Sequence, residues 1–297
     1  MRPTASVIAT GECCIACGHV NLRILHRIDQ YAIAQCPRCL LARTLGASVE
    51  PATFYDGSYF AGGDCSKGYS DYFALADAIQ RTFRARIRRL RRSAPSAHTL
   101  LDAGCGPGFF VREASRHGFD ACGLEVSEYA VRCGVKDLGQ RIVQGPIDAA
   151  HLDEAGGPFD IITLWDTIEH LPAPDEALQA LSGRLRPDGI LALSTGDVTS
   201  LAARAAGPRW HLFNLPEHLW FFSVPSLKRL LHRAGLTVER VEREICWYTA
   251  QYLLERLLFS FGRRSGRLPA VATLRRVQVP VTLLDIVTVY ARRPRSV

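Results

Sequence analysis

From residue 98 onward, apolar runs of strand length alternate with amphipathic stretches of helix length, and this alternation restricts the fold more than any other feature. It is typical of βαβ units, in which helices join parallel strands. The expected strands are Thr99–Ala103, Asp120–Glu125, Arg141–Gln144, Asp160–Trp165, Gly189–Thr195, Thr237–Arg243 and Asp285–Ala291. Helices are expected to begin near Phe109, Ser127, Asp175 and Ser226. We therefore predict an α/β fold with a seven-stranded, Rossmann-like sheet that has helices on both faces.

Composition divides the chain into three segments. Residues 1–45 hold five of the ten cysteines, and residues 46–97 are first aromatic and then rich in arginine. Residues 98–297 carry the α/β pattern, interrupted by a less regular insert at 245–284. We predict a small metal-binding module, a helical connecting segment and an α/β domain. The insert is expected to be a substrate-side lid or an oligomer contact rather than a membrane-surface helix.

The cysteines of the first segment form two C-x₂-C pairs, Cys14-Ile-Ala-Cys17 and Cys36-Pro-Arg-Cys39. This spacing is typical of a structural zinc site with four thiolate ligands, and about 45 residues need such a staple to fold. We predict that Cys14, Cys17, Cys36 and Cys39 bind Zn²⁺, with Cys13 as an alternative to Cys14. Four sulfur ligands leave no open position, so the zinc is expected to be structural.

Nothing in the sequence indicates an oxidising or membrane environment. The N-terminus lacks the charged and apolar pattern of an export signal, and no segment approaches the roughly 20 apolar residues that span a bilayer. Clustered cysteines then indicate metal rather than disulfides. We expect a cytoplasmic protein without a transmembrane segment.

The formal net charge is +7, and arginine supplies nearly all of the positive charge. Within the arginine-rich stretch Arg81–Arg92, Phe83, Ile87 and Leu90 recur at helical spacing. One stripe of this helix should therefore pack while its arginines face solvent. A nucleic-acid patch is the alternative interpretation.

A glycine-rich stretch, Leu100-Leu-Asp-Ala-Gly-Cys-Gly-Pro-Gly-Phe-Phe110, follows the first expected strand and opens a helix. Gly104, Gly106 and Gly108 are spaced i, i+2, i+4, which differs from the dinucleotide fingerprint. Pro107 has no N–H group, so the turn is a poor phosphate cradle. The spacing instead allows a flat, uncharged or cationic ligand to approach the backbone closely.

Two acids accompany the glycine turn. Asp102 lies just before it, where a carboxylate can attract the ammonium group of an amino-acid moiety. Glu125 ends the next strand and can accept hydrogen bonds from both hydroxyls of a ribose. The glycine turn alone is a weak signal, but the turn, the strand-end acid and the βαβ context together are a strong one.

With these features, roughly residues 96–297 resemble the class I S-adenosylmethionine-dependent methyltransferases. The resemblance implies that the turn holds the methionine part of the cofactor and that Glu125 holds its ribose. In the family, the loop after the third strand contacts the adenine; here it is Gln144-Gly-Pro-Ile-Asp148, with proline where an acid often stands. The residues expected to bind the cofactor are Asp102, Gly104, Cys105, Gly106, Gly108, Glu125, Pro146, Ile147 and Trp165.

Candidate catalytic side chains follow the fourth strand at Asp166, Glu169 and His170, and His218 follows the fifth. On one helical turn, the spacing i, i+3, i+4 would place the first three on one face. An acceptor hydroxyl must lose its proton as it attacks the methyl group, and histidine is suited to take it. His170 is the candidate base, oriented by Glu169 or Asp166. Alternatively the histidine only caps and packs, or the two acids and two histidines hold a divalent metal ion.

The resemblance extends to bacterial methyltransferases of deoxysugar, polysaccharide and secondary-metabolite pathways, some of which carry an N-terminal zinc module. The sugar C-methyltransferases among them usually have a further C-terminal domain, and the sequence shows none. The expected reaction is therefore O-methylation of a small-molecule or sugar acceptor. The alternatives are an RNA methyltransferase, whose binding would weaken steeply with salt, and a non-catalytic binding protein, which would fail to bind S-adenosylmethionine.

Overall fold

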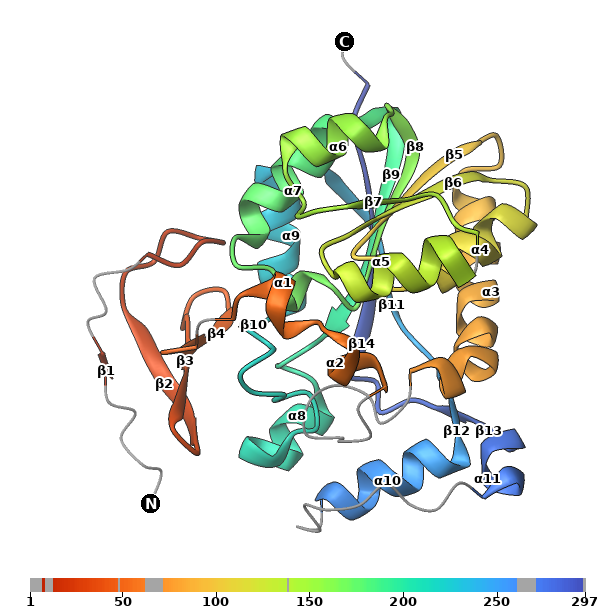
Figure 1. Ribbon diagram of the computed structural model, residues 1–297. Helices are drawn as coiled ribbons and strands as arrows, with labels where there is room; N and C mark the ends of the chain where they lie inside the picture. Colours follow the sequence, from red (N-terminus) through yellow and green to blue (C-terminus); the bar gives the residue numbers. More distant parts are fainter. Residues whose placement is uncertain are drawn as a thin grey trace. The chain divides into compact units, whose positions relative to one another are not determined.

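The structure, a computed structural model, describes residues 7–8, 13–47, 49–61, 72–137, 139–260 and 271–295 (Figure 1). The chain divides into two compact units. We call one the cysteine–histidine unit; it consists of Met1–Val49, Leu164–Glu244 and Leu283–Val297. The other, the glycine-turn unit, consists of Glu50–Thr163 and Ile245–Thr282.

Within the described ranges, seven strands form one sheet in the order β11-β14-β9-β8-β5-β6-β7. Their bounds are β5 Thr99–Ala103, β6 Asp120–Glu125, β7 Ile142–Gln144, β8 Phe159–Trp165, β9 Leu185–Gly196, β11 Thr237–Arg243 and β14 Ile286–Arg292. Pairs β5–β6, β5–β8 and β6–β7 are parallel, whereas β14 is antiparallel to both β9 and β11. The predicted fold class is confirmed, and each predicted strand overlaps an observed one.

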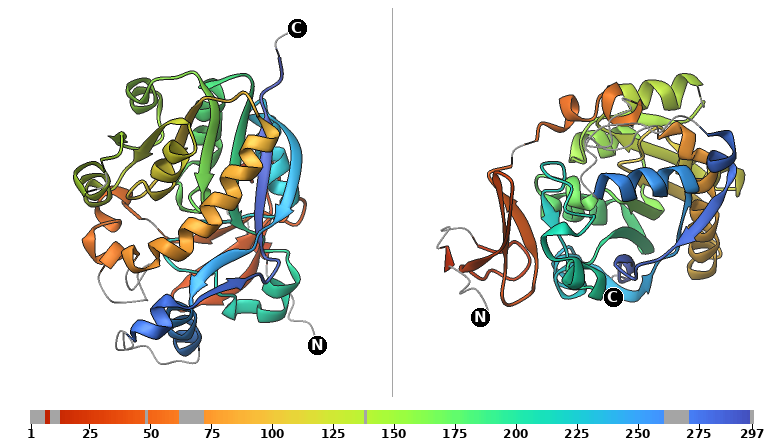
Figure 2. Two further views of the ribbon diagram at one scale, coloured as in Figure 1. Left: turned by 90° about the vertical axis from the view of Figure 1, so that its right-hand side faces the viewer. Right: turned by 90° about the horizontal axis from the view of Figure 1, so that it is seen from below.

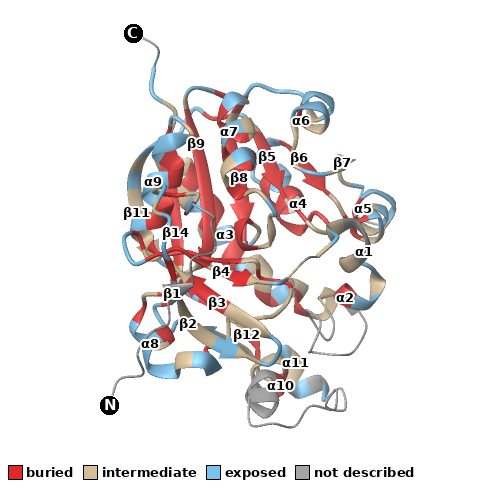
Figure 3. Cartoon of the chain, turned by 90° about the vertical axis from the view of Figure 1, so that its left-hand side faces the viewer, coloured by how far each residue is buried: buried red, intermediate tan, exposed pale blue. Residues whose placement is uncertain are grey.

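Helices of the glycine-turn unit connect and cover its parallel strands. They are α1 Pro51–Phe54, α2 Gly57–Ala61, η1 Phe73–Leu75, α3 Ala76–Ser93, α4 Phe109–Arg116, α5 Glu128–Arg132, η2 Cys133–Asp137 and α6 Ala149–Ala155. Helix α4 packs against β5 and β6, and α3 packs against α4. Strands β5 and β6 are buried along most of their length (Figure 3). Burial on both faces explains why these strands read as continuous apolar runs.

The arginine-rich stretch forms most of α3, and its apolar stripe is buried as predicted. Phe83, Ile87 and Leu90 all lie inside the unit. One arginine departs from the expectation, because Arg86 is buried on the same helix. Burying a guanidinium group is costly unless its charge is compensated, and the charge of Arg86 acts on the buried carboxyl group of Asp102.

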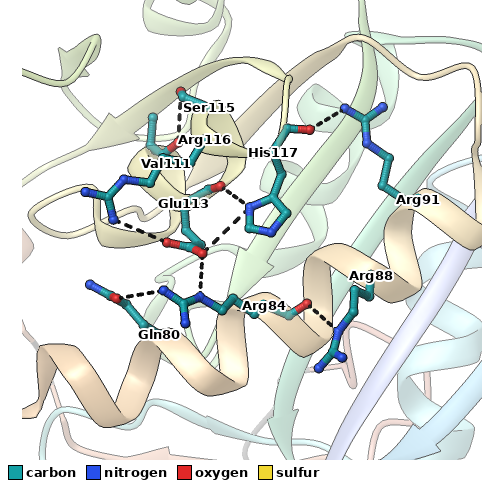
Figure 4. A network of polar contacts seen from close by, with 9 residues as sticks. All are labelled: Gln80, Arg84, Arg88, Arg91, Val111, Glu113, Ser115, Arg116 and His117. Atoms are coloured by element: carbon teal, nitrogen blue, oxygen red, sulfur yellow. Dashed lines mark hydrogen bonds and ion pairs between the residues drawn. The ribbon is translucent and has the colours of Figure 1, made fainter.

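Other arginines of α3 attach the helix to its neighbours (Figure 4). Arg84 Nε lies 2.7 Å from Glu113 Oε1, and the Glu113 side chain is buried. Arg91 donates to the carbonyl oxygens of Ala97 at 2.6 Å and His117 at 2.9 Å. These two arginines therefore bind groups of the protein itself.

The insert of the glycine-turn unit consists of the antiparallel hairpin β12 Cys246–Thr249 and β13 Gln278–Val281 with α10 Ala250–Ser260 and α11 Ala272–Arg276 (Figure 2). Trp247 N donates to Thr82 Oγ1 at 3.0 Å, which ties the hairpin to α3. On α10, Gln251 and Glu255 are buried and joined by a 3.0 Å hydrogen bond. The lid or oligomer role stays a prediction, and residues 261–270 lie outside the described part.

The cysteine–histidine unit contains a second sheet, of order β1-β2-β3-β4-β10 among the described residues. Its strands are β1 Val7–Ile8, β2 Leu22–Ile28, β3 Tyr31–Gln35, β4 Ala42–Leu45 and β10 Trp220–Phe221, all paired antiparallel. Its helices are η3 Ile168–His170, α7 Pro174–Gly183, α8 Leu201–Ala206, η4 Gly207–Arg209 and α9 Val224–Arg233. No helix in the described ranges is long and apolar enough to cross a membrane.

Candidate active site

The glycine turn joins β5 to α4 through a left-handed backbone. Gly104, Gly106 and Gly108 have φ angles of +75°, +53° and +76°. Side-chain-bearing residues rarely adopt this conformation, which explains the three glycines. A Cβ atom on Gly108 would also approach Ile142 Cδ1 to 2.9 Å. Gly108 is therefore packed against neighbouring side chains, whereas Gly104 and Gly106 are half-buried and leave backbone without side chains that a flat ligand can approach closely.

Asp102 is buried at the end of β5, beside the turn. The hydroxyl of Thr163 donates to Asp102 Oδ1 at 2.6 Å. Burial raises the pKa of Asp102 to about 7, and the Thr163 hydrogen bond and the charge of Arg86 act in the opposite direction. A cationic group bound here would favour the carboxylate form.

Glu125 ends β6 and is fixed by two backbone amides. Gly106 N donates to Glu125 Oε2 and Ser127 N donates to Oε1, both at 2.8 Å. Burial raises the pKa of Glu125, and these hydrogen bonds lower it. A carboxylate has about four lone-pair positions, so both oxygens can still accept hydrogen bonds from ribose hydroxyls. The structure thus holds the acid of the second strand directly against the glycine turn.

An aromatic cluster lies beside the turn, and the sequence did not predict it there. Its members include Phe60, whose Cε1 would lie 3.9 Å from a Cβ on Gly106, and Tyr129, which stacks on Phe60 with centroids 6.0 Å apart. Tyr72 stacks on Phe109 at 5.6 Å. The aromatic residues in the first part of segment 46–97 were the sequence feature from which this cluster could have been predicted.

The other expected cofactor residues occupy different environments. Pro146 is exposed and Ile147 is half-buried in the loop between β7 and α6, whereas Cys105 is buried inside the glycine turn. Trp165 is buried at the end of β8 and belongs to the cysteine–histidine unit. Their roles in binding stay predictions.

Three of the four candidate catalytic side chains come together in the cysteine–histidine unit. One ligand atom from each of Glu169, His170 and His218 lies within 4.8 Å of the others, and the two imidazole rings are 4.6 Å apart. Asp166 is not part of this metal-ligand-like group: the hydroxyl of Ser194 donates to Asp166 Oδ1 at 2.9 Å, and the charge of Asp166 acts on His170 by raising its pKa against the effect of burial. We call Glu169, His170 and His218 the acid–histidine group.

Backbone carbonyls fix both rings of the acid–histidine group. His170 Nδ1 lies 3.1 Å from Glu217 O, and His218 Nδ1 lies 2.8 Å from Leu212 O. A carbonyl oxygen only accepts, so each Nδ1 carries a hydrogen, and in a neutral ring the lone pair then lies on Nε2. Burial lowers the pKa of His170 to about 4, which keeps its ring neutral at pH 7. Such second contacts are typical of histidines that bind metal or take a proton.

The cysteine cluster of the same unit brings the four predicted ligands together. Sγ atoms of Cys14 and Cys39 are 3.4 Å apart, and those of Cys17 and Cys36 are 3.5 Å apart. All four lie within 4.8 Å of one another, whereas Cys13 is exposed. A tetrahedral ZnS₄ site with Zn–S bonds of 2.3 Å needs S···S distances of about 3.8 Å. The donor set and spacing therefore fit zinc.

Each C-x₂-C pair forms the same tight loop. Gly18 N donates to Cys14 O at 2.8 Å, and Leu40 N donates to Cys36 O at 2.9 Å. Both closing residues are left-handed, with φ of +71° at Gly18 and +62° at Leu40. One difference is that a leucine rather than a glycine closes the second loop.

Comparison with known proteins agrees with this geometry. The sequence profile of a family described as a methyltransferase domain matches residues 75–241, more than half of the chain. A ubiquinone biosynthesis O-methyltransferase from Caulobacter vibrioides is 32% identical over 130 residues, covering 41% of this chain and 52% of that protein. One from Cereibacter sphaeroides is 30% identical over 146 residues, covering 46% and 59%. The chain thus spans about half the length of these curated relatives.

Among solved structures, the YcgJ protein from Bacillus subtilis is similar with a TM-score of 0.52 and 13% identity. The similarity covers 73% of this chain and all of that protein, and it supports the fold alone. Family match, sheet order and glycine turn agree, and the chain belongs to the class I S-adenosylmethionine-dependent methyltransferases.

Proposed function

We propose that this protein transfers the methyl group of S-adenosylmethionine to a hydroxyl of a small organic acceptor, such as a phenol or a sugar. The proposal rests mainly on the hydrogen bond from Gly106 N to Glu125 Oε2, which holds the acid at the end of β6 against the glycine turn. The two curated relatives described above are named O-methyltransferases of ubiquinone biosynthesis, and this supports oxygen as the methylated atom.

In this proposal, the cofactor lies along the glycine turn. Asp102 attracts its ammonium group, Glu125 accepts from its ribose hydroxyls, and Pro146 and Ile147 border its adenine. Cys105 and Gly104 contribute backbone. When bound, S-adenosylmethionine supplies an electrophilic methyl group on a sulfonium centre.

The acid–histidine group is proposed to act on the acceptor hydroxyl. It follows β8 in the chain, and ligands of doubly wound sheets bind at the carboxyl ends of the strands. The lone pair on His170 Nε2 can take the proton as the hydroxyl attacks, while the carbonyl oxygen of Glu217, which accepts from Nδ1, orients the ring. Glu169 stays a candidate member of the group.

The same group also fits a divalent metal ion, a second interpretation favoured by the convergence of Glu169, His170 and His218 within 4.8 Å. Such an ion would bind the acceptor oxygen and lower the pKa of its hydroxyl. The Cys14, Cys17, Cys36 and Cys39 cluster is proposed to bind a separate, structural Zn²⁺.

The test is a methylation assay with radiolabelled S-adenosylmethionine, catechol and methyl glucoside, with metal quantified on the same sample. We expect transfer to one acceptor and one zinc per chain, or a second divalent ion if the group binds metal. The substitution His170→Ala should lower turnover at least about a hundredfold while S-adenosylhomocysteine binds as before.

The control is His232→Ala, because His232 is an exposed histidine at the end of α9, in the same unit but outside the group. Unchanged turnover in His170→Ala would remove this residue from the proposal. Failure of the wild-type protein to bind S-adenosylhomocysteine would overturn the proposal and favour a non-catalytic binding protein.

A further inference from the structure

The segment 217–223 carries His218 and is bound on one side by the cysteine module, which we define as residues 13–45. Thr44 Oγ1 donates to the carbonyl oxygen of His218 at 2.8 Å. Thr44 N donates to the carbonyl oxygen of Leu219 at 2.9 Å. A single threonine therefore holds two consecutive carbonyl groups at the candidate site.

Two further contacts extend this attachment. Strand β10 pairs antiparallel with β4 and adds a short edge strand to the sheet of the cysteine module (Figure 1). The hydroxyl of Ser223 donates to the carbonyl oxygen of Cys39 at 2.7 Å. Because Cys39 is one of the four clustered cysteines, the attachment reaches the proposed metal site.

On its other side, the segment 217–223 holds the turn that carries Glu169 and His170. Leu219 N donates to Glu169 O at 2.9 Å, and His170 Nδ1 donates to Glu217 O at 3.1 Å. The indole nitrogen of Trp220 also donates to the carbonyl oxygen of Leu171 at 3.0 Å. The segment thus lies between the cysteine module and the acid–histidine group and is hydrogen-bonded to both.

We propose that the cysteine module positions the acid–histidine group, and that Thr44 is the positioning residue through which it acts. The module holds the backbone of His218 and Leu219, and Leu219 in turn holds Glu169. Loosening this chain of contacts shifts the two imidazole rings relative to each other. The expected effect on turnover rests on the proposed function, whereas the effect on the rings does not.

Thr44 suits this role because it is only 4% exposed and its hydroxyl has a defined acceptor. Valine has nearly the same shape but no donor, so Thr44→Val leaves a buried carbonyl without this hydrogen bond. Serine keeps the hydroxyl. The pair of variants separates the hydrogen bond from the volume of the side chain.

A general loss of stability would also lower activity, so a second buried threonine of the same unit serves as control. Thr288 is 2% exposed, and its hydroxyl donates to Glu244 at 3.3 Å. Neither residue belongs to segment 217–223 or to the acid–histidine group. Thr288→Val should therefore lower the melting temperature without changing the two histidines.

The experiment records long-range ¹H–¹⁵N correlations of ¹⁵N-histidine-labelled protein for the wild type, Thr44→Val, Thr44→Ser and Thr288→Val. It also measures the kcat for catechol or methyl glucoside, whichever the wild type methylates, and the Kd of S-adenosylhomocysteine. In Thr44→Val we expect shifted or exchange-broadened His170 and His218 signals and a kcat at least about tenfold lower. The Kd should stay within about twofold, because Asp102 and Glu125 belong to the other unit. Thr44→Ser should restore most of the kcat.

Two results would overturn the proposal: wild-type histidine signals in Thr44→Val, or the same signal changes in Thr288→Val. If the wild type methylates neither acceptor, the proposed function fails on these substrates. The histidine signals of Thr44→Val still decide the positioning role in that case.

Discussion

The glycine turn and the acid–histidine group are built in opposite ways. The turn takes its shape from consecutive residues, with left-handed glycines at 104, 106 and 108 and an acid reached across one strand pair. The acid–histidine group joins residues 169–170 to residue 218 through backbone contacts that the cysteine module supports. A site made by local backbone can be recognised from its spacing, whereas a site made by tertiary contacts depends on segments far along the chain.

The largest expected effect tests the local character of the glycine turn. In Gly106→Val, a β-branched residue would have to adopt φ near +53°, and its side chain would cover the backbone that the cofactor approaches. We expect S-adenosylhomocysteine to bind at least about a hundredfold more weakly by titration calorimetry, with unchanged metal content.

Gly235→Val is the matched control, because Gly235 has φ of +77° with no atom within 4 Å of an added Cβ and lies in the other unit. It should lose about 1 kcal/mol of unfolding free energy through backbone strain but bind the ligand normally. Equal loss of binding in both variants would mean that strain alone, rather than access to the turn, explains the effect.

A moderate effect is expected from the pH dependence of cofactor binding. Burial raises the pKa of Asp102 to about 7, so below pH 7 the folded protein increasingly holds this group protonated. The raised pKa means that burying the charge costs stability above about pH 7, and that this cost disappears as the pH falls toward the ordinary aspartate value. A cationic ammonium group binds the carboxylate form, so affinity should decrease by about tenfold from pH 8 to pH 6.

Titration calorimetry of S-adenosylhomocysteine across this range measures the slope, and Asp102→Asn provides the comparison. The amide cannot titrate, so its affinity should be low at pH 8 and nearly independent of pH. A slope that persists in Asp102→Asn would assign the titration to another group.

The same contrast explains what the sequence could predict. The strands, the fold class and the position of Asp102 and Glu125 beside the glycine turn could be predicted, because each follows from residues that lie within about 25 positions of one another in the sequence. The cysteine cluster follows from the spacing within each pair. The burial of Arg86, the position of Phe60 beside Gly106 and the attachment of His218 to Thr44 could not be predicted, because each depends on packing between distant segments.

Asp166 shows the limit of the helical-spacing argument. The i, i+3, i+4 pattern predicts three side chains on one face only if the helix begins at residue 166. The helical turn η3 instead begins at Ile168, and a left-handed Asp166 precedes it. The sequence therefore predicted Glu169, His170 and His218 as candidates, but it could not predict that the backbone of His218 is attached to Thr44.

The smallest expected effect concerns the two C-x₂-C loops of the cysteine–histidine unit, which share one backbone shape. It tests whether consecutive residues also set the shape of these loops, as they do in the glycine turn. Gly18 is exposed with no atom within 4 Å of an added Cβ, so Gly18→Ala tests φ alone and should cost about 1 kcal/mol of unfolding free energy. Leu40→Gly relieves a similar strain but loses half-buried apolar surface and gains entropy in the unfolded chain. These terms oppose each other, so its unfolding free energy should change by less than about 1 kcal/mol. Chemical denaturation of the zinc-loaded protein measures both. If Leu40→Gly lowers the unfolding free energy clearly more than Gly18→Ala, the packing of the Leu40 side chain outweighs the backbone strain at this residue. This loop would then be shaped by tertiary contacts, like the acid–histidine group.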